Sequence, residues 1–309
     1  MGIHSRKRVY YILNKITKKP KPPPQSLTTD ESGKLLESAE QSAQMWFRFL
    51  RDKFKQTDQE VNRPEMDDIP SYRSPNSVLT RREFDTAVAC MKNNKAVGPD
   101  GIPAEAIKYS SAVKDTLFEI VEAIWEQETL SEGFAQAKFV MIYKNKGSSN
   151  DPSNYRCIAL LNHAYKILSR IILMRLTGNG ENYLPDWQAG FRKNRGCRDN
   201  IFIMRTLFEK MMQLGRSLTV SYIDYSASFD TVSHKFLDKA LADAGASNKV
   251  RAMFRAIYRS ASAFTVVKGT DHKGVKSDVF PILRGVLQGD ILSPLFFILA
   301  LTLILKRHG

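Results

Sequence analysis

The 309-residue chain has few cysteines, few acidic residues and no long apolar run. Its three cysteines, Cys90, Cys157 and Cys197, lie far apart without a Cys-x-x-Cys pair, which excludes a disulfide framework and a cysteine-based zinc site. The most apolar stretch, 291–305, contains polar residues and a proline, and it is shorter than the roughly 20 residues of a membrane-spanning helix. The N-terminus lacks the apolar core of a signal peptide. We therefore expect an intracellular protein, cytoplasmic or nuclear, without a membrane segment.

Acidic residues are clearly outnumbered, because 46 Lys and Arg face 32 Asp and Glu and the net charge is +14. Residues 1–24 hold seven of the basic residues and no acid, so half of the net charge remains on the rest of the chain. The leader itself is typical of a solvated arm that ends in a stiff proline-rich linker. A surface this basic favours polyanions, and we expect nucleic acid as the partner.

Composition divides the chain into a basic, proline-rich leader over 1–24, a helix and connector over 25–78, and a compact domain over 79–309. In the second part, apolar residues at three- and four-residue spacings predict a helix over 34–56. The compact domain opens with a capping box formed by Thr80 and Glu83, which starts a helix that reaches Met91.

The compact domain mixes strands and helices without a regular βαβ repeat, which predicts an α/β (α+β) fold. Strands are expected at 138–143, 155–160, 218–223, 263–267 and 277–283. Helices are expected at 111–128, 162–176, 198–213 and 231–244, and a last helix is expected with Ser293 as its cap and Pro294 at its first position.

Two carboxylates follow the apolar run 218–223. Asp224 stands at the end of this predicted strand, where a carboxylate in a basic protein is typical of a Mg²⁺ ligand that faces a phosphate. An ordinary turn residue is the alternative for Asp224. Asp230 comes six residues later, directly before the predicted helix, where an N-cap role is the favoured interpretation.

A polar hairpin and a glycine-bearing loop are the other candidates for chemistry. The predicted hairpin presents the cations Lys144, Lys146 and Arg156, which suit a triphosphate but also fit a solvated basic hairpin. Gly285 and Gly289 flank Gln288 before the last helix, and glycine allows a backbone to approach a ligand closely.

The order of these segments resembles the reverse transcriptase domain of non-LTR (LINE-type) retrotransposons. The segments that carry the resemblance are Lys95-Ala-Val-Gly-Pro-Asp-Gly-Ile-Pro-Ala-Glu105, Tyr155-Arg-Cys-Ile-Ala-Leu160, Gln188-Ala-Gly-Phe-Arg192, Ile223-Asp-Tyr-Ser-Ala-Ser-Phe-Asp230 and Gly285-Val-Leu-Gln-Gly-Asp-Ile-Leu-Ser-Pro294. It implies fingers and a partial palm, with an antiparallel palm sheet packed on helices. It also implies an RNA template, a DNA primer and dNTPs as partners, and leaves the oligomeric state open.

The resemblance implies a role for each matching residue. Asp224 corresponds to a catalytic metal ligand, assisted by the backbone carbonyl of Tyr225, with Mg²⁺ (or Mn²⁺) as the cofactor. Phe229 corresponds to the aromatic residue that excludes a ribonucleotide 2′-OH. Metal ions of this kind activate the primer 3′-OH and stabilise the leaving pyrophosphate.

The remaining roles concern the nucleotide and the template. Lys144 and Arg156 correspond to finger cations that hold the incoming triphosphate. Gln288 and Gly289 correspond to the loop that lines the nucleotide and the template base. Lys95, Gly98 and Arg192 correspond to template-side contacts. The sequence departs from the family pattern at Cys157, where proline is usual, and at Ala159, where serine is usual.

The family's Tyr-x-Asp-Asp motif and its thumb are expected after the last helix and do not occur in the 309 residues. We therefore expect template-directed dNTP addition as the family activity, with the chain as given inactive by itself. The alternative is a non-catalytic RNA-binding module or a decayed fragment that retains the polymerase scaffold.

Affinity for RNA should fall steeply with salt, since backbone contacts dominate such binding and release counterions. Deletion of residues 1–24 should reduce the salt slope without abolishing binding, because half of the net charge remains. Titration of a labelled primer–template at two salt concentrations measures both effects. Binding that ignores salt, or that is absent at low salt, would contradict the expectation.

Overall fold

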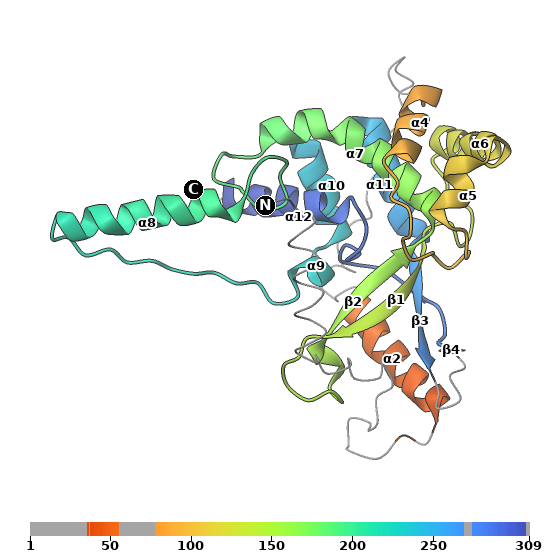
Figure 1. Ribbon diagram of the computed structural model, residues 1–309, viewed down its shortest axis with the longest axis horizontal. Helices are drawn as coiled ribbons and strands as arrows, with labels where there is room; N and C mark the ends of the chain where they lie inside the picture. Colours follow the sequence, from red (N-terminus) through yellow and green to blue (C-terminus); the bar gives the residue numbers. More distant parts are fainter. Residues whose placement is uncertain (1–35, 37, 56–77, 269–273, 307–309) are drawn as a thin grey trace, which may run out of the picture.

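The computed structural model describes residues 36, 38–55, 78–268 and 274–306 (Figure 1). The predicted leader over 1–24 and nearly all of the connector over 57–78 lie outside these residues. The helices are α2 (Ala39–Phe54), α4 (Arg81–Ala89), α5 (Ala104–Tyr109), α6 (Ser111–Gln127), α7 (His163–Tyr183), α8 (Cys197–Gln213), α9 (Ser228–Thr231), α10 (His234–Asp243), α11 (Asn248–Ser260) and α12 (Ser293–Lys306). The strands are β1 (Gln136–Tyr143), β2 (Tyr155–Leu161), β3 (Ser262–Lys268), β4 (Gly274–Lys276) and β5 (Phe280–Pro281). No described helix combines the length and apolar character needed to cross a membrane.

The strands form a mixed sheet in the order β2-β1-β3-β4, and β5 pairs with β3. β1 and β2 form an antiparallel hairpin in which Tyr143 lies opposite Tyr155. β3 pairs antiparallel with β4 and β5 but parallel with β1. The predicted combination of helices and a sheet is confirmed. The expected antiparallel sheet is wrong at the β1–β3 pair, which is parallel because the chain crosses over through helices between these two strands.

Helix α2 packs on the sheet and shares its hydrophobic core. Trp46, Leu50 and Phe54 recur at four-residue spacing and are almost fully buried. The ring of Phe54 stacks on Phe139 of β1 at 5.4 Å between centroids, and Trp46 meets Tyr155 of β2 edge-on at 5.1 Å. Figure 1 shows α2 alongside the strands, below the group formed by α4, α5 and α6. The predicted helix over 34–56 is therefore confirmed from residue 39 to residue 54.

The capping box predicted at the start of α4 is also present. Thr80 Oγ1 accepts a hydrogen bond from Glu83 N at 3.3 Å, and Thr80 N donates to Glu83 Oε2 at 3.0 Å. The same carboxylate receives Arg175 of α7, whose Nε lies 2.8 Å from Glu83 Oε1. The Glu83 carboxylate that caps α4 thus also links this helix to α7.

The predicted helix over 231–244 is confirmed over residues 234–243 as α10, which begins three residues later than predicted. The short helix α9 precedes it and was not expected, and the backbone at Val232 between the two is extended. Val232 O accepts from Gly285 N at 2.7 Å, and Phe229 O accepts from Val286 N at 2.6 Å. Another segment thus binds carbonyls that a helix continuing from α9 into α10 would use internally, so the two helices stay separate.

The predicted cap of the last helix is wrong. Helix α12 begins at Ser293 itself, and Ser293 Oγ has no hydrogen-bond partner among the described residues. The backbone before the helix is held by Asp290 instead, whose Oδ1 accepts from Leu292 N at 3.3 Å.

The strand predicted at 218–223 is also wrong. Residues 214–225 form neither a helix nor a strand that pairs with another strand. Tyr222 and Ile223 in this segment are 86% and 76% exposed. Helix α8, which precedes this segment, has no buried residue and projects away from the other elements in Figure 1. An apolar run forms a strand only where a neighbouring strand supplies hydrogen bonds to its backbone, and no described segment does so here.

Two helices besides α9 were not expected. The short α5 begins after Pro103 without a side-chain cap, so it carries little local signal. Helix α11 is strongly amphipathic and is capped by Ser247, whose hydroxyl accepts from Val250 N at 3.3 Å. The spacing of its apolar residues is typical of a helix, so this helix could have been predicted from the sequence.

Replacement of Trp46 by alanine should cost about 3–5 kcal/mol of unfolding free energy, since it leaves a large cavity between α2 and the hairpin. Glu40→Ala on the same helix is the matched control and should change stability by about 0.5 kcal/mol or less. Urea unfolding of the three proteins measures both. Equal stability of Trp46→Ala and the parent would show that α2 does not belong to the cooperative core.

Candidate functional site

A polar pocket with a volume of about 530 Å³ lies between α2, the β1–β2 hairpin, α9 and the 285–289 loop. Its charged wall residues are the cations Arg48, Lys53, Lys144 and Arg156 and the carboxylates Asp52 and Asp230. Phe49, Ser153, Tyr155, Cys157, Ala227 and Gln288 complete the lining. Cations outnumber carboxylates, so the pocket favours an anionic ligand.

Two of the predicted finger cations reach this pocket from one hairpin. Lys144 N donates to Asn154 O at 2.8 Å, and Lys144 Nζ donates to Ser153 O at 2.7 Å, which fixes the hairpin end. Arg156 lies on β2 opposite Ile142 and is exposed. Within the described residues its guanidinium has no hydrogen bond or ion pair, so all its donors can face a ligand.

Gln288 enters the same pocket from the loop before α12. Its backbone carbonyl accepts from Ala159 N of β2 at 2.7 Å. Gly289 follows with φ +126°, and a Cβ at this position would collide with the carbonyl of Ala159. Glycine is therefore required at 289, because the loop packs directly on the backbone of the strand.

The buried carboxylate of Asp290 secures the other side of this loop. Tyr165 of α7 donates its hydroxyl to Asp290 Oδ2 at 2.8 Å. Burial raises the pKa of Asp290 above its usual range, although these hydrogen bonds oppose the shift. Burial likewise raises the pKa of Tyr165. The 288–290 segment is thus held by β2 on one side and by α7 on the other.

The predicted capping role of Asp230 is wrong. Asp230 lies inside the α9 turn, is 4% exposed, and its Oδ2 is 2.8 Å from Lys53 Nζ of α2. Ser233 is the N-cap of α10, the helix that Asp230 was expected to cap, and Ala227, with φ +50°, is the N-cap of α9. A Cβ on Gly285 would come within 2.6 Å of the Asp230 carbonyl oxygen, so the two loops are in direct backbone contact.

Phe229 precedes Asp230 but does not line the pocket. Its ring stacks on Phe297 of α12 at 4.7 Å between centroids and meets Phe191 edge-on at 5.8 Å. It lies in an aromatic cluster beside the site.

The predicted metal ligand lies apart from these residues. Asp224 and Tyr225 belong to the exposed segment 214–225, and Asp224 makes no contact with another described side chain through a hydrogen bond or ion pair. Nowhere in the described parts of the chain do three or more His, Cys, Asp or Glu residues gather as a metal site requires.

The three predicted template-side residues also lie outside the pocket. Lys95 is exposed, and Gly98 packs so closely on Asn162 that a Cβ would come within 2.5 Å of the Asn162 nitrogen. Arg192 donates to the carbonyls of Pro185 and Gln188 at 2.8 and 3.3 Å, and so stabilises its own turn.

The contribution of α2 to the pocket was missed. Arg48, Phe49, Asp52 and Lys53 lie on the polar side of a helix whose apolar side was predicted. Charged residues on such a face are usually solvated, so the sequence held no signal that these would meet residues near positions 150 and 230.

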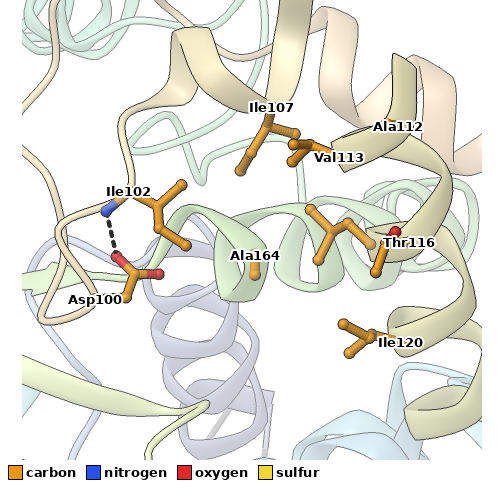
Figure 2. Close-up of a pocket in the computed structure, with 9 residues that line it drawn as sticks. Asp100, Ile102, Ile107, Ala112, Val113, Thr116, Ile120 and Ala164 are labelled. Carbon is orange, nitrogen blue, oxygen red and sulfur yellow. Dashed lines mark hydrogen bonds between the residues drawn. The ribbon is translucent and has the colours of Figure 1, made fainter. Parts of the chain in front are cut away.

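A second cavity of about 350 Å³ lies between the 98–103 loop, α5, α6 and the start of α7 (Figure 2). Its lining is apolar apart from Asp100 and Thr116. Asp100 Oδ1 accepts from Ile102 N at 3.0 Å, and the two residues lie at one side of the cavity in Figure 2. The lining contains no cation and no predicted site residue, so it does not suit an anionic ligand.

Comparison with known proteins gives one family match. The profile of the family described as reverse transcriptase (RNA-dependent DNA polymerase) matches residues 142–308. Among curated proteins, the RNA-directed DNA polymerase from the mobile element jockey of Drosophila melanogaster is 24% identical over 93% of this chain and 32% of its own length. The Pol polyprotein from the retrotransposable element R2DM of the same species is 28% identical over 72% of this chain and 20% of its own length. That of the element R2 of Nasonia vitripennis is 24% identical over 74% and 21%. The chain thus spans about a third or less of each relative.

Alkylation of Cys157 should be at least about a hundredfold slower than that of the exposed Cys90 and Cys197, because the thiolate is the reactive form. Burial raises the pKa of Cys157 to about 11, despite the nearby Lys53 ammonium. About one thiol in a thousand is then ionised at pH 8, and the rate should increase with pH toward 11.

Mass spectrometry of peptides after timed iodoacetamide treatment measures the three rates. Treatment in urea is the control, in which all three cysteines should react alike. Equal rates in the folded protein would contradict the burial of Cys157.

Proposed function

The chain belongs to the reverse transcriptase (RNA-dependent DNA polymerase) family, and we propose that it forms the fingers and part of the palm of a non-LTR retrotransposon polymerase. Members of this family use an RNA template and a primer. The relatives from R2, R2DM and jockey, which are retrotransposable or mobile elements by name, support this assignment. The chain spans about a third or less of these relatives, and we propose RNA-directed DNA synthesis as the activity to which it contributes.

The observation that carries the proposal is the convergence of Lys144, Arg156 and Gln288 on one pocket from separate segments. A triphosphate needs fixed positive charge, and arginine supplies paired donors while lysine supplies a point charge. Gln288 offers both a donor and an acceptor beside the close-packed backbone of Gly289. A deoxynucleoside triphosphate is therefore the ligand that this arrangement fits best.

Roles are also proposed for Phe229 and for the template-side residues. The resemblance alone supports a role of Phe229 in excluding a ribonucleotide 2′-OH, because its ring packs on Phe191 and Phe297 beside the pocket. Lys95 is an exposed cation that suits a nucleic acid backbone. Arg192 is engaged with its own turn, so its proposed contribution is to hold the 185–192 loop that a template would meet.

Reverse transcriptases use divalent metal ions, and Mg²⁺ (with Mn²⁺ as a substitute) is the ion proposed here. Two ions in register need several converging oxygen ligands. Asp224 with the carbonyl of Tyr225 does not provide them, and no cluster of three ligands occurs among the described residues. The described residues therefore do not fit a two-metal site, and nucleotide binding is the part of the activity that they support.

The second candidate is a non-catalytic RNA-binding module. The exposed position of Asp224, separate from the pocket, favours it. Both candidates share nucleic acid as the partner, and they differ in whether a primer is extended.

Primer extension on an RNA template with Mg²⁺ distinguishes the two functions. We expect no synthesis by the 309-residue chain alone, because the metal ligands are incomplete. Fusion to a downstream segment that carries Tyr-x-Asp-Asp should allow synthesis, and Asp224→Ala in the fusion should abolish it. Asp278→Ala, at another exposed aspartate, is the matched control and should retain activity.

Synthesis by the chain alone that is lost in Asp224→Ala would show that other ligands complete the site. Synthesis by the fusion that survives Asp224→Ala would refute the role of Asp224. RNA binding by a fusion that never extends a primer would favour the non-catalytic module.

A further inference from the structure

Lys53 of α2 lies outside residues 142–308, which carry the family match, and yet it lines the proposed nucleotide pocket. Its ammonium is 2.8 Å from Asp230 Oδ2, and the two side chains are only 19% and 6% exposed. An ion pair so withdrawn from water is screened far less than a surface pair. Loss of one partner would leave an uncompensated charge in the wall of the pocket.

The backbone of Lys53 makes a second contact with the site. Arg284 Nε donates to Lys53 O at 2.9 Å, and Leu283 N donates to Phe54 O at 3.1 Å. The last carbonyls of a helix have no partner within the helix, so these bonds satisfy the end of α2. Residues 283–284 lead directly into the loop that carries Gln288.

Lys53 therefore reaches both halves of the site, its side chain the α9 turn and its carbonyl the base of the 285–289 loop. These halves are also joined to each other, because Gly285 N and Val286 N donate to the carbonyls of Val232 and Phe229. Helix α2, the α9 turn and the start of the 285–289 loop thus each contact the other two.

The charges of the pocket give these contacts a consequence for ligand binding. Because Asp230 is paired with Lys53, the two together contribute little to the electrostatic potential in the pocket. The finger cations Lys144 and Arg156 therefore make this potential positive. Without Lys53, the buried Asp230 carboxylate would repel the phosphates of a nucleotide across a poorly screened distance. Loss of Lys53 removes one positive charge whatever the state of Asp230, but only a charged Asp230 would also be left unpaired in the wall and would displace the α9 turn.

We propose that Lys53 is a positioning residue of the nucleotide site, which acts through Asp230 by neutralising its carboxylate and holding the α9 turn against the Gln288 loop. This inference rests on the proposed function of the pocket. It extends the site to a helix upstream of the matched segment.

The test is a double-mutant cycle on nucleotide affinity. The probe is 2-aminopurine deoxyribonucleoside triphosphate with Mg²⁺, titrated by fluorescence into the 309-residue chain bound to an RNA template and a dideoxy-terminated DNA primer. Lys53→Met should weaken binding by about tenfold, and Lys53→Arg should keep it within about threefold. In the Asp230→Asn background, Lys53→Met should weaken binding by no more than about threefold, since only the loss of one positive charge remains. Lys55→Met, at an exposed lysine two residues away, is the control and should have no effect.

Other outcomes would overturn the inference in distinct ways. An equal loss in both backgrounds would mean that Lys53 acts on the triphosphate through its own charge and not through Asp230. Unchanged affinity of a folded Lys53→Met protein would leave the ion pair a purely structural role, which urea unfolding would register separately. Should Lys53→Met fail to fold, Lys53→Gln completes the cycle, because its amide can still donate to Asp230 but carries no charge. Absence of nucleotide binding by the parent chain would refute the proposed site itself.

Discussion

Close backbone contact between residues 229–232 and residues 285–286 is the constraint on which the rest of the site depends. The amides of Gly285 and Val286 bind the carbonyls of Val232 and Phe229, and no side chain fits between Gly285 and Asp230. These bonds end the α9 turn before a longer helix can form. They also place Gln288 next to β2, so one contact determines the shape of two loops.

The pocket beside this junction has a charge pattern that depends on parts of the chain far apart in sequence. The hairpin supplies Lys144 and Arg156, the loop supplies Gln288, and α2 supplies Lys53 beside Asp230. Because Asp230 is neutralised by an ion pair, the pocket can hold a buried carboxylate and still favour an anion. Packing of α2 on the sheet, through Trp46 and Phe54, is thereby linked to the electrostatics of ligand recognition.

The segment with the strongest chemical signal in the sequence has the weakest tertiary support. Asp224 follows an apolar run that was expected to form a strand, but the run is exposed and unpaired among the described residues. Helix α8 before it is likewise without a buried side chain. A strand requires hydrogen bonds from a neighbour, so residue preference alone did not produce one, and Asp224 does not approach the pocket cations.

The sequence by itself determined the features that arise within a few residues. These include the Thr80–Glu83 capping box, the hairpin that presents Lys144 and Arg156, and the glycine at 289 that close packing requires. Only the tertiary structure decided that Asp230 pairs with Lys53 rather than capping a helix, that the predicted 231–244 helix begins at His234, and that α2 joins the site. The reason is physical: spacing and capping report interactions along one segment, whereas ion pairs, loop contacts and strand ladders depend on which distant segment packs alongside.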